Sequence, residues 1–144
     1  PLKILDFLLC DDIRVEVKNK ITIVGTYNDQ LVFETLSGKE VSEVRSVRAA
    51  AYIKLLLYKE EGASSFKISL GDKLSDKVYF EQTFQVDPNH PYGAPFPILL
   101  HPLTLNLLPG EVVQLKVETE VDKGSKEVEV SVSEYKVLER KLPA

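Results

Sequence analysis

The sequence predicts an all-β chain that folds as a single two-layer antiparallel β-sandwich of about nine strands, with residues 1–144 as one domain. A length of 144 residues is usual for one domain, and 44% hydrophobic with 28% charged residues is typical of a folded globular protein. Apolar and polar residues alternate with a period of two through much of the chain, and turn residues separate the alternating runs. One sheet could not cover so many apolar faces, so we expect two sheets packed face to face.

The second half of the chain carries the clearest alternation. Between residues 111 and 122 the odd positions are mostly apolar and the even positions polar, which places one face of a strand inward and the other in water. Residues 66–70 and 78–86 show the same pattern. Each of the three ranges is therefore predicted to be a strand with one buried face.

Turn residues connect these strands. Leu108-Pro109-Gly110-Glu111 has proline and glycine where a type II turn needs them, and it predicts a hairpin that joins strand 98–108 to the next strand. Residues 122–125 contain Gly124 and predict a further hairpin, leading into the last strand.

The last strand changes phase part of the way along. Its apolar residues Val128, Val130 and Val132 occupy even positions, whereas Tyr135 and Val137 occupy odd ones. An extra residue in one strand produces such a slip, so a β-bulge or a strand end is predicted after Val132.

The first half of the chain is less regular. Residues 2–10 are apolar on both faces, which fits a central strand. Residues 21–26 and 31–36 form two further apolar runs, and the polar residues between them predict a hairpin. Residues 37–46 are predicted to be a loop or one short helix, and a long strand with alternating apolar residues follows from 47 to 57.

Composition narrows the classes of partner and compartment. A net charge of -4 without a basic block argues against nucleic acid and anionic membranes as partners. No apolar run approaches the roughly 18 residues of a membrane span, and Asp6 interrupts the apolar start, which disfavours an export signal. Cys10 is the only cysteine, so a reducing, cytoplasmic location is expected.

One long loop is the first candidate for binding. Residues 87–97 contain four prolines, which make the loop stiff, and they bring Asp87, Asn89, His90 and Tyr92 together. These side chains either cap turns or bind calcium, a lipid head group or a sugar. A calcium site would need further oxygen ligands from Asp11, Asp12 or Asp29 on adjoining loops.

The sequence does not contain a pattern typical of catalysis. Cys10, His90 and His101 are too far apart in sequence for zinc-ligand spacing, and no nucleophile elbow or glycine-rich phosphate loop is present. Cys10 is interpreted as a buried structural residue and His101 as a partly buried, hydrogen-bonded side chain on the face of Leu99 and Leu103. We predict no catalytic residues, no metal and no cofactor; a hydrolase using Cys10 or a serine with a histidine is a third hypothesis.

A tyrosine-bearing strand face is the second candidate for binding. Ala50, Tyr52, Leu56 and Tyr58 fall on one face of the strand predicted from residue 47, and aromatic side chains often anchor protein partners. This face is either covered by the rest of the fold or used as an interface. The first hypothesis is therefore a non-enzymatic protein-interaction or structural module, including a homo-oligomer through this face. The alternative is a ligand-binding module that uses loop 87–97.

The N-terminal residues resemble a known family. The runs Phe7-Leu8-Leu9-Cys10-Asp11-Asp12-Ile13-Arg14 and Asn19-Lys20-Ile21-Thr22-Ile23-Val24-Gly25-Thr26-Tyr27 are similar to the start of a bacterial family of small β-sandwich proteins known only as a domain of unknown function. Leu108-Pro109-Gly110 and the valine-rich last strand look like the end of that family. The resemblance implies a cytoplasmic, non-enzymatic protein and provides no functional residues.

Overall fold

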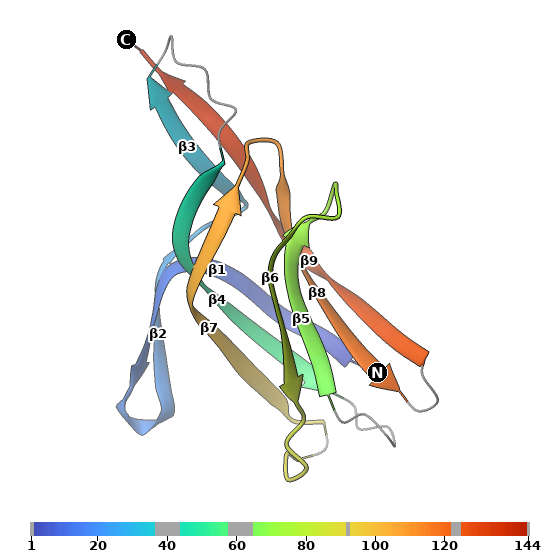
Figure 1. Cartoon of the computed structure of the whole chain (residues 1–144). Coiled ribbons are helices and arrows are strands. Elements are labelled where there is room, and N and C mark those ends of the chain that lie inside the picture. The colour runs from blue at the N-terminus through green and yellow to red at the C-terminus, as the bar shows by residue number, and fades with distance from the viewer. Residues whose placement is uncertain (1, 37–43, 58–64, 92, 122–124, 144) are drawn as a thin grey trace.

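The computed structural model describes residues 2–36, 44–57, 65–91, 93–121 and 125–143. Over these residues nine strands form two sheets that lie face to face (Figure 1), which confirms the predicted all-β class and agrees with the expected number of about nine strands. The only helical segment of the described residues is a single 3-10 turn, η1 (Val17–Asn19).

The strands are β1 (Leu2–Glu16), β2 (Lys20–Thr26), β3 (Gln30–Leu36), β4 (Arg45–Leu57), β5 (Ser65–Asp72), β6 (Val78–Gln85), β7 (Pro95–Leu107), β8 (Val112–Val121) and β9 (Ser125–Leu142). The four-stranded sheet has the order β2-β1-β4-β7 and the five-stranded sheet the order β3-β9-β8-β5-β6. Strands β3 and β9 run parallel, so the expectation of a wholly antiparallel sandwich is wrong for this pair. The helix considered for 37–46 falls largely outside the described residues, and Arg45 and Ser46 already belong to β4.

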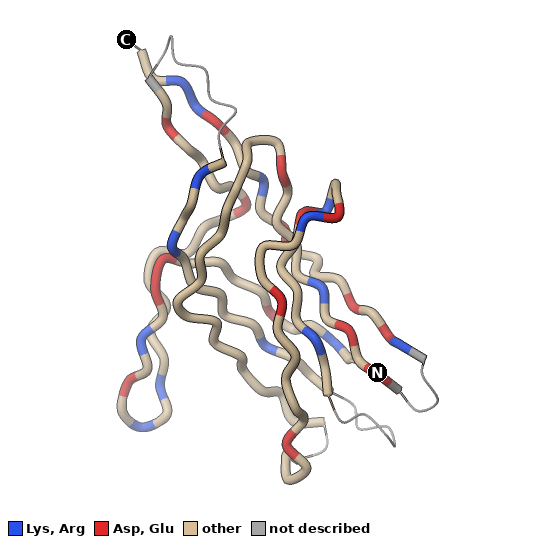
Figure 2. The backbone as a smooth tube through the Cα atoms, viewed as in Figure 1, with Lys and Arg blue, Asp and Glu red and all other residues tan. Residues whose placement is uncertain are grey.

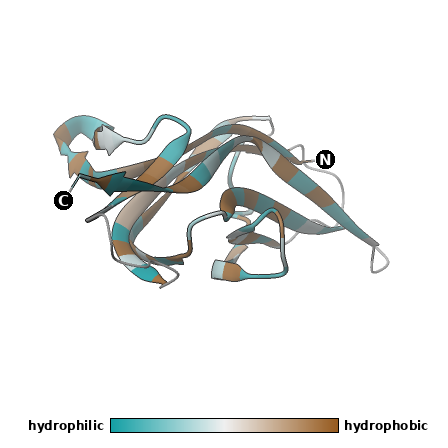
Figure 3. Ribbon diagram, turned by 90° about the horizontal axis from the view of Figure 1, so that it is seen from above, coloured by the Kyte–Doolittle hydropathy of each residue, from teal (hydrophilic) through white to brown (hydrophobic). Residues whose placement is uncertain are grey.

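The core lies between the two sheets and is built from alternate positions of the strands. Strand β4 contributes the odd positions from Ala49 to Leu57, and β8 contributes Val113, Leu115 and Val117, all buried as the alternation predicted. Apolar and polar residues alternate along the strands in Figure 3. Burying each large aliphatic side chain stabilises the fold by about 1.5–3 kcal/mol, so these paired faces hold the sheets together.

Tyr135 joins the two sheets through a polar contact inside the core. Its hydroxyl lies 3.0 Å from the backbone nitrogen of Leu9, which donates to it, and donates to the carbonyl of Phe7 at 3.4 Å. These backbone groups belong to the part of β1 that β2 does not cover, because the β1–β2 ladder begins at Cys10. Tyr135 therefore satisfies backbone groups at a strand edge that would otherwise be buried without partners.

The turn after β7 has the predicted conformation but a different role. The Glu111 amide donates to the carbonyl of Leu108 at 3.1 Å, and Gly110 has a φ of 96°, as a type II turn requires. Strands β7 and β8 belong to different sheets, so the predicted hairpin is wrong and the turn is a crossover between layers. The amide of Gly110 donates to the carbonyl of Val137. This bond holds the turn against β9, so the chain does not turn back along β7.

The first hairpin of the chain joins β1 and β2. The sequence had predicted a hairpin between β2 and β3 instead. Strand β2 pairs with the second half of β1, and β3 crosses to the other sheet, so the β2–β3 hairpin is wrong. Lys18 and Asn19 reverse the chain with φ angles of 61° and 63°. At the hairpin base Gly25 has a φ of 66°, and a Cβ there would lie 2.4 Å from the Asp11 carboxylate, so any other residue would be strained and would have to displace Asp11.

Strand β7 changes phase near its middle. Ile98 and Leu100 face the core, and so do Leu103 and Leu105, so the inward positions change from even to odd between residues 100 and 103. Strand β4 has an irregular register at Ala49/Ala51 opposite this point. Consequently Leu99 and His101 do not share the inward face of Leu103, which corrects the sequence interpretation.

The last strand has an irregular register near the predicted place, but the predicted change of face is wrong, because even positions face outward on both sides of it. Gln114 pairs with Glu134, but Lys116 pairs with Val130, so β9 has two extra residues at this point. Ser131 accommodates them, because its hydroxyl accepts a hydrogen bond from the Leu115 amide at 3.1 Å and donates to the Ser133 carbonyl at 2.7 Å.

Candidate functional site

The loop from 87 to 97 uses its polar groups on its own backbone. The Asp87 carboxylate accepts the Asn89 amide at 2.9 Å, and the Asp87 carbonyl accepts the His90 amide at 3.0 Å. His90 Nε2 lies 2.6 Å from the Ala94 carbonyl oxygen. Asp87 therefore caps a turn, which is one of the two roles considered for it. Asn89 is exposed, and Tyr92 lies outside the described residues.

An apolar cavity lies behind this loop, at one end of the sandwich. Its volume is about 260 Å³, and aromatic and aliphatic side chains line most of it: Phe66, Phe84, Val86, His90, Phe96 and Ile98. The rings of Phe66 and Phe84 stack with centroids 5.5 Å apart, and His90 meets Phe96 edge to face at 5.0 Å. The sequence interpretation emphasised the polar residues of the loop and missed this aromatic wall, which two strands of one sheet and one strand of the other assemble.

The carboxylates of Asp11 and Asp12, considered as calcium ligands, contact side chains of this chain. Asp11 accepts a hydrogen bond from the Tyr27 hydroxyl at 2.8 Å, and Asp12 lies 3.2 Å from His101 Nε2. The Asp29 carbonyl accepts the Lys136 amide on the other sheet. Over the part of the chain that the structure describes, no three histidine, cysteine or acidic side chains come together as a metal site.

Cys10 occupies an apolar position. It is fully buried, its thiol faces the Ala50 carbonyl at 3.5 Å, and burial raises its pKa. A raised pKa disfavours the nucleophilic thiolate. His101, also considered as a base, is exposed, so the predicted partial burial is wrong; its Nε2 lies 3.2 Å from a carboxylate oxygen of Asp12.

A second apolar cluster lies outside the core, on the outer face of the four-stranded sheet. Its fully covered members are Cys10, Ile13 and Ala50, and Ile23, Tyr52 and Leu99 pack against them. Tyr52 and Leu56, two of the residues predicted to form an interface, are half-buried on this face. Tyr58 lies outside the described residues. The β1–β2 hairpin contributes Ile13 and Ile23, so part of this face is covered by the chain itself.

The same hairpin extends beyond the cluster with apolar side chains in solvent. It projects from the body of the sandwich at the lower left of Figure 1, and Val15, Val17 and Ile21 are 75%, 82% and 36% exposed. Val15 and Ile21 are cross-strand partners, two residues along from the pair Ile13 and Ile23. We call Val15, Val17 and Ile21 the hairpin surface.

Basic residues alternate with the apolar residues of this hairpin. Arg14, Lys18 and Lys20 are exposed on the hairpin, as is the acidic Glu16, and Arg14 Nε lies 3.6 Å from the carboxylate of Asp12. Figure 2 shows these blue and red segments on the projecting hairpin. The chain as a whole has a net charge of -4, so the tip of this hairpin, with Lys18 and Lys20, is a local exception. Sequence analysis missed it because the run was divided between two expected elements.

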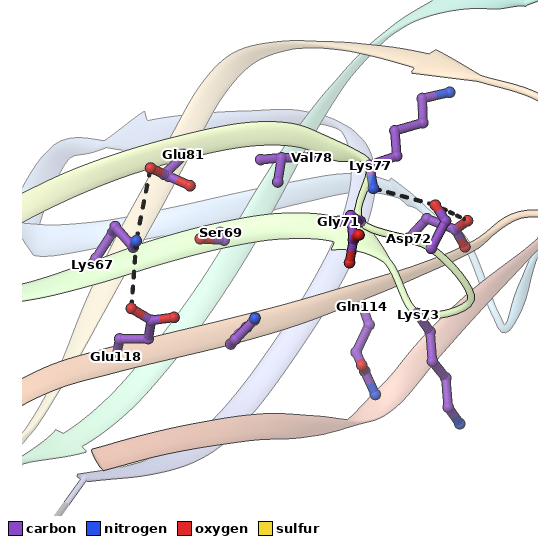
Figure 4. A pocket seen from close by; sticks show the side chains of 13 residues that line it. Lys67, Ser69, Gly71, Asp72, Lys73, Lys77, Val78, Glu81, Gln114 and Glu118 are labelled. Carbon is purple, nitrogen blue, oxygen red and sulfur yellow. Dashed lines mark hydrogen bonds and ion pairs between the residues drawn. The ribbon is translucent and has the colours of Figure 1, made fainter. Parts of the chain in front are cut away.

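The outer face of the five-stranded sheet is built from charges instead. A hollow of about 210 Å³ is lined by residues of β5, β6 and β8 and by the turn 72–77 (Figure 4). Lys67 lies between Glu81 and Glu118, at 3.8 and 3.4 Å. Burial acts to raise the pKa of Asp72, but hydrogen bonds from Val112, Ser75 and Leu74 and the charge of Lys77 lower it overall. The charges of this hollow largely neutralise one another.

No family model matches the chain, and no curated protein matches it. The part of the chain that the structure describes contains no helix with the length and apolarity needed to cross a bilayer.

Proposed function

We propose that this chain is a non-enzymatic protein-interaction module whose contact site is the hairpin surface, together with the half-buried outer face around Tyr52. One observation supports the proposal above the others. Apolar cross-strand pairs extend from the covered Ile13 and Ile23 to Val15 and Ile21, and Val17 follows, 82% exposed on a projecting hairpin. Exposed contiguous apolar residues with a polar border are typical of protein contact sites.

The charges next to the hairpin indicate the chemistry of the partner. Arg14, Lys18 and Lys20 favour an apolar surface bordered by acidic groups, since complementary charge assists association. They disfavour contact between two copies of the hairpin, because like charges would face one another. The buried Cys10 supports a reducing, cytoplasmic location for this function.

Site-specific photo-crosslinking tests the proposal. A photoreactive residue is placed at Val17, and a matched control at Leu74, which is 68% exposed on the turn after β5. We expect one adduct of defined mass from position 17 in an extract of the source cells. The adduct should be lost when the chain with the photoreactive residue at position 17 also carries Val15→Lys. It should also be lost when that chain carries Lys18→Glu and Lys20→Glu together. Equal adducts at both positions, or binding of the hairpin to vesicles of anionic lipid in place of protein, would overturn the proposal.

A second candidate function rests on the cavity behind loop 87–97. Its aromatic and aliphatic walls suit a small apolar or aromatic group better than calcium, which needs several oxygen ligands. Toluene is a suitable probe, since apolar cavities of about 150 Å³ already accept a benzene ring. Toluene is expected to perturb the NMR signals of Phe84 and Phe96 in the native chain and not in a Phe84→Asp variant; unchanged signals in the native chain would remove this candidate.

A further inference from the structure

The cavity behind loop 87–97 has an apolar inner end and a polar outer end. Strands β6 and β7 are the edge strands of their sheets, and both contribute residues to the cavity. At the inner end Phe66 and Ile98 are buried, with exposed fractions of 4% and 9%. At the outer end Gln85 and Asp87 are exposed to solvent. A ligand with one apolar end and one polar end therefore fits this cavity in one orientation.

Three aromatic rings form much of the cavity wall. Phe66 stacks on Phe84 with an interplanar angle of 14°, and its ring centroid lies 5.8 Å from that of Phe96. The faces of such rings attract other aromatic rings and cations. The cavity volume of about 260 Å³ exceeds the roughly 150 Å³ that is enough for benzene, so one ring with a short side chain fits.

Asp87 and His90 provide hydrogen-bond acceptors beside this wall. Nε2 of His90 lies 2.6 Å from the carbonyl oxygen of Ala94, and a carbonyl oxygen only accepts, so Nε2 carries the proton. In the neutral ring Nδ1 is then an acceptor. The Asp87 carboxylate accepts the Asn89 amide at 2.9 Å and, because a carboxylate has several acceptor positions, it can accept a further donor from a ligand.

The charge beside the cavity is negative. The described residues that line it include one carboxylate, that of Asp87, and no lysine or arginine. A ligand with a carboxylate or phosphate group would be repelled, which disfavours a fatty acid or a phosphate head group. A cation would be attracted, and the aromatic wall adds to this attraction.

The loop that carries these acceptors is held by its own backbone. The Asp87 carbonyl accepts the His90 amide at 3.0 Å, and the Pro91 carbonyl accepts the Ala94 amide at 3.2 Å. The contact between the His90 ring and Ala94 ties the two turns together. The cavity is therefore preformed, which reduces the ordering cost that a ligand must overcome on binding.

We propose that the cavity binds a small arylalkylamine, an aromatic ring that carries an ammonium group on a short alkyl chain. The ring lies at the inner end against Phe66 and Ile98, and the ammonium group lies at the outer end beside Asp87. The proposal rests on the second candidate function, binding of a small molecule in this cavity, and adds the charge of the ligand. It does not involve the hairpin surface.

Three ligands with the same ring and different charges test the proposal on the native chain. They are phenethylammonium, which as an alkylamine is protonated at neutral pH, neutral phenethyl alcohol and the anion hydrocinnamate. Each is titrated while the NMR signals of Phe84 and Phe96 are followed. Phenethylammonium should bind at least about threefold more tightly than phenethyl alcohol, and hydrocinnamate most weakly. The preference should shrink in about 1 M salt. Equal affinities for the three ligands would overturn the proposal.

Toluene separates this proposal from the second candidate function. If toluene binds and the three ligands show no order by charge, the cavity is an apolar site without preference for a cation. The proposal would then be wrong and the second candidate function would stand. If neither toluene nor phenethylammonium perturbs the signals of Phe84 and Phe96, both are wrong.

A matched pair of variants tests the role of Asp87. Asp87→Asn removes the charge and keeps an oxygen that can accept the Asn89 amide. The affinity for phenethylammonium should fall to that for phenethyl alcohol, and toluene binding should not change. Asp76→Asn, the same substitution in the exposed turn after β5, is the control and should keep the preference. A preference that survives in Asp87→Asn, or that both variants lose equally, would refute the role of Asp87.

Nuclear Overhauser contacts between ligand and protein test the orientation. The ring protons of phenethylammonium should give contacts with Phe66 and Ile98 at the inner end. The methylene protons next to its nitrogen should give contacts with His90, which follows Asp87 in the same turn. The reverse set of contacts would contradict the predicted orientation.

Discussion

The outer faces of the two sheets differ in what they present to the surroundings, although both sheets share one core. On the four-stranded sheet, Ala50 and Cys10 are fully covered beneath Tyr52 and Leu99. On the five-stranded sheet the corresponding face carries the ion pairs of Lys67. The first face excludes water over a small area, and the second is solvated.

This difference indicates where a partner would gain most on binding. Removing apolar side chains from water is favourable at about 25 cal/mol per Å², whereas surface ion pairs contribute little. The four-stranded face and its hairpin are therefore the better contact site. The variants below test whether the two faces differ as described.

The largest contrast is expected from placing a carboxylate on each face. Ala50→Glu would bury an unpaired charge in the outer cluster and should cost about 3–5 kcal/mol of unfolding free energy. Thr83→Glu, at an exposed position opposite Lys67, should change stability by less than about 0.5 kcal/mol. Urea unfolding of both variants gives the comparison, and similar costs would show that the outer cluster is accessible to water.

A smaller effect is expected in the core that the two sheets share. Tyr135→Phe leaves the buried Leu9 amide without its acceptor and should cost about 1–3 kcal/mol. Tyr27→Phe removes the hydroxyl contact to Asp11 on the exposed side and should cost about 0.5 kcal/mol or less. Thermal or urea unfolding distinguishes them. If Tyr27→Phe lowered the unfolding free energy more than Tyr135→Phe, the hydrogen bonds of Tyr135 would not be what stabilises the contact between the sheets.

The charged face should show its own dependence on pH. The pKa of Asp72 is lowered in the folded chain, so its ionised form adds stability above the unfolded pKa of about 3.9, and this stability is lost as pH falls through the folded value. Asp72→Asn loses an acceptor of Ser75 and should cost about 1–2 kcal/mol at pH 7. The difference from the native chain should narrow at pH 2–3. A constant difference across this range would contradict the assignment.

The smallest effect is expected at the ion pairs of the hollow. Lys67→Met removes both contacts to Glu81 and Glu118, and keeps most of the side-chain volume. Because these groups are partly exposed, the cost should be below about 1 kcal/mol and should shrink in 1 M salt. A larger cost that does not respond to salt would mean that the hollow is structurally essential.

Period-two alternation predicted β4, β5 and β8 well, because in these strands one face meets the core along the whole length. It could not say which face of the first half of β9 is covered. The valines at 128, 130 and 132 share a face by periodicity, but the core lies on the side of Glu129. Which side of a strand is buried depends on the position of the second sheet, and that is not encoded locally.

Turn residues also predicted the local conformation but not the arrangement of the strands around it. Pro109 and Gly110 predicted the type II conformation, since φ preferences act within the turn itself. Whether the flanking strands pair or separate into two layers depends on strands far along the chain. The aromatic wall of Phe66, Phe84 and Phe96 was missed for this reason, because it forms only where β5, β6 and β7 meet.

By itself the sequence determined that this protein is all-β, with about nine strands, a buried long strand from residue 47, and a turn at Pro109-Gly110. These features follow from side-chain periodicity and backbone preferences, which act over a few residues. Only the tertiary structure decided that β2 returns along β1, that β3 runs parallel to β9, and that Val128, Val130 and Val132 of β9 face outward. These features depend on contacts between residues up to about a hundred positions apart, such as the pairing of Val32 with Leu138.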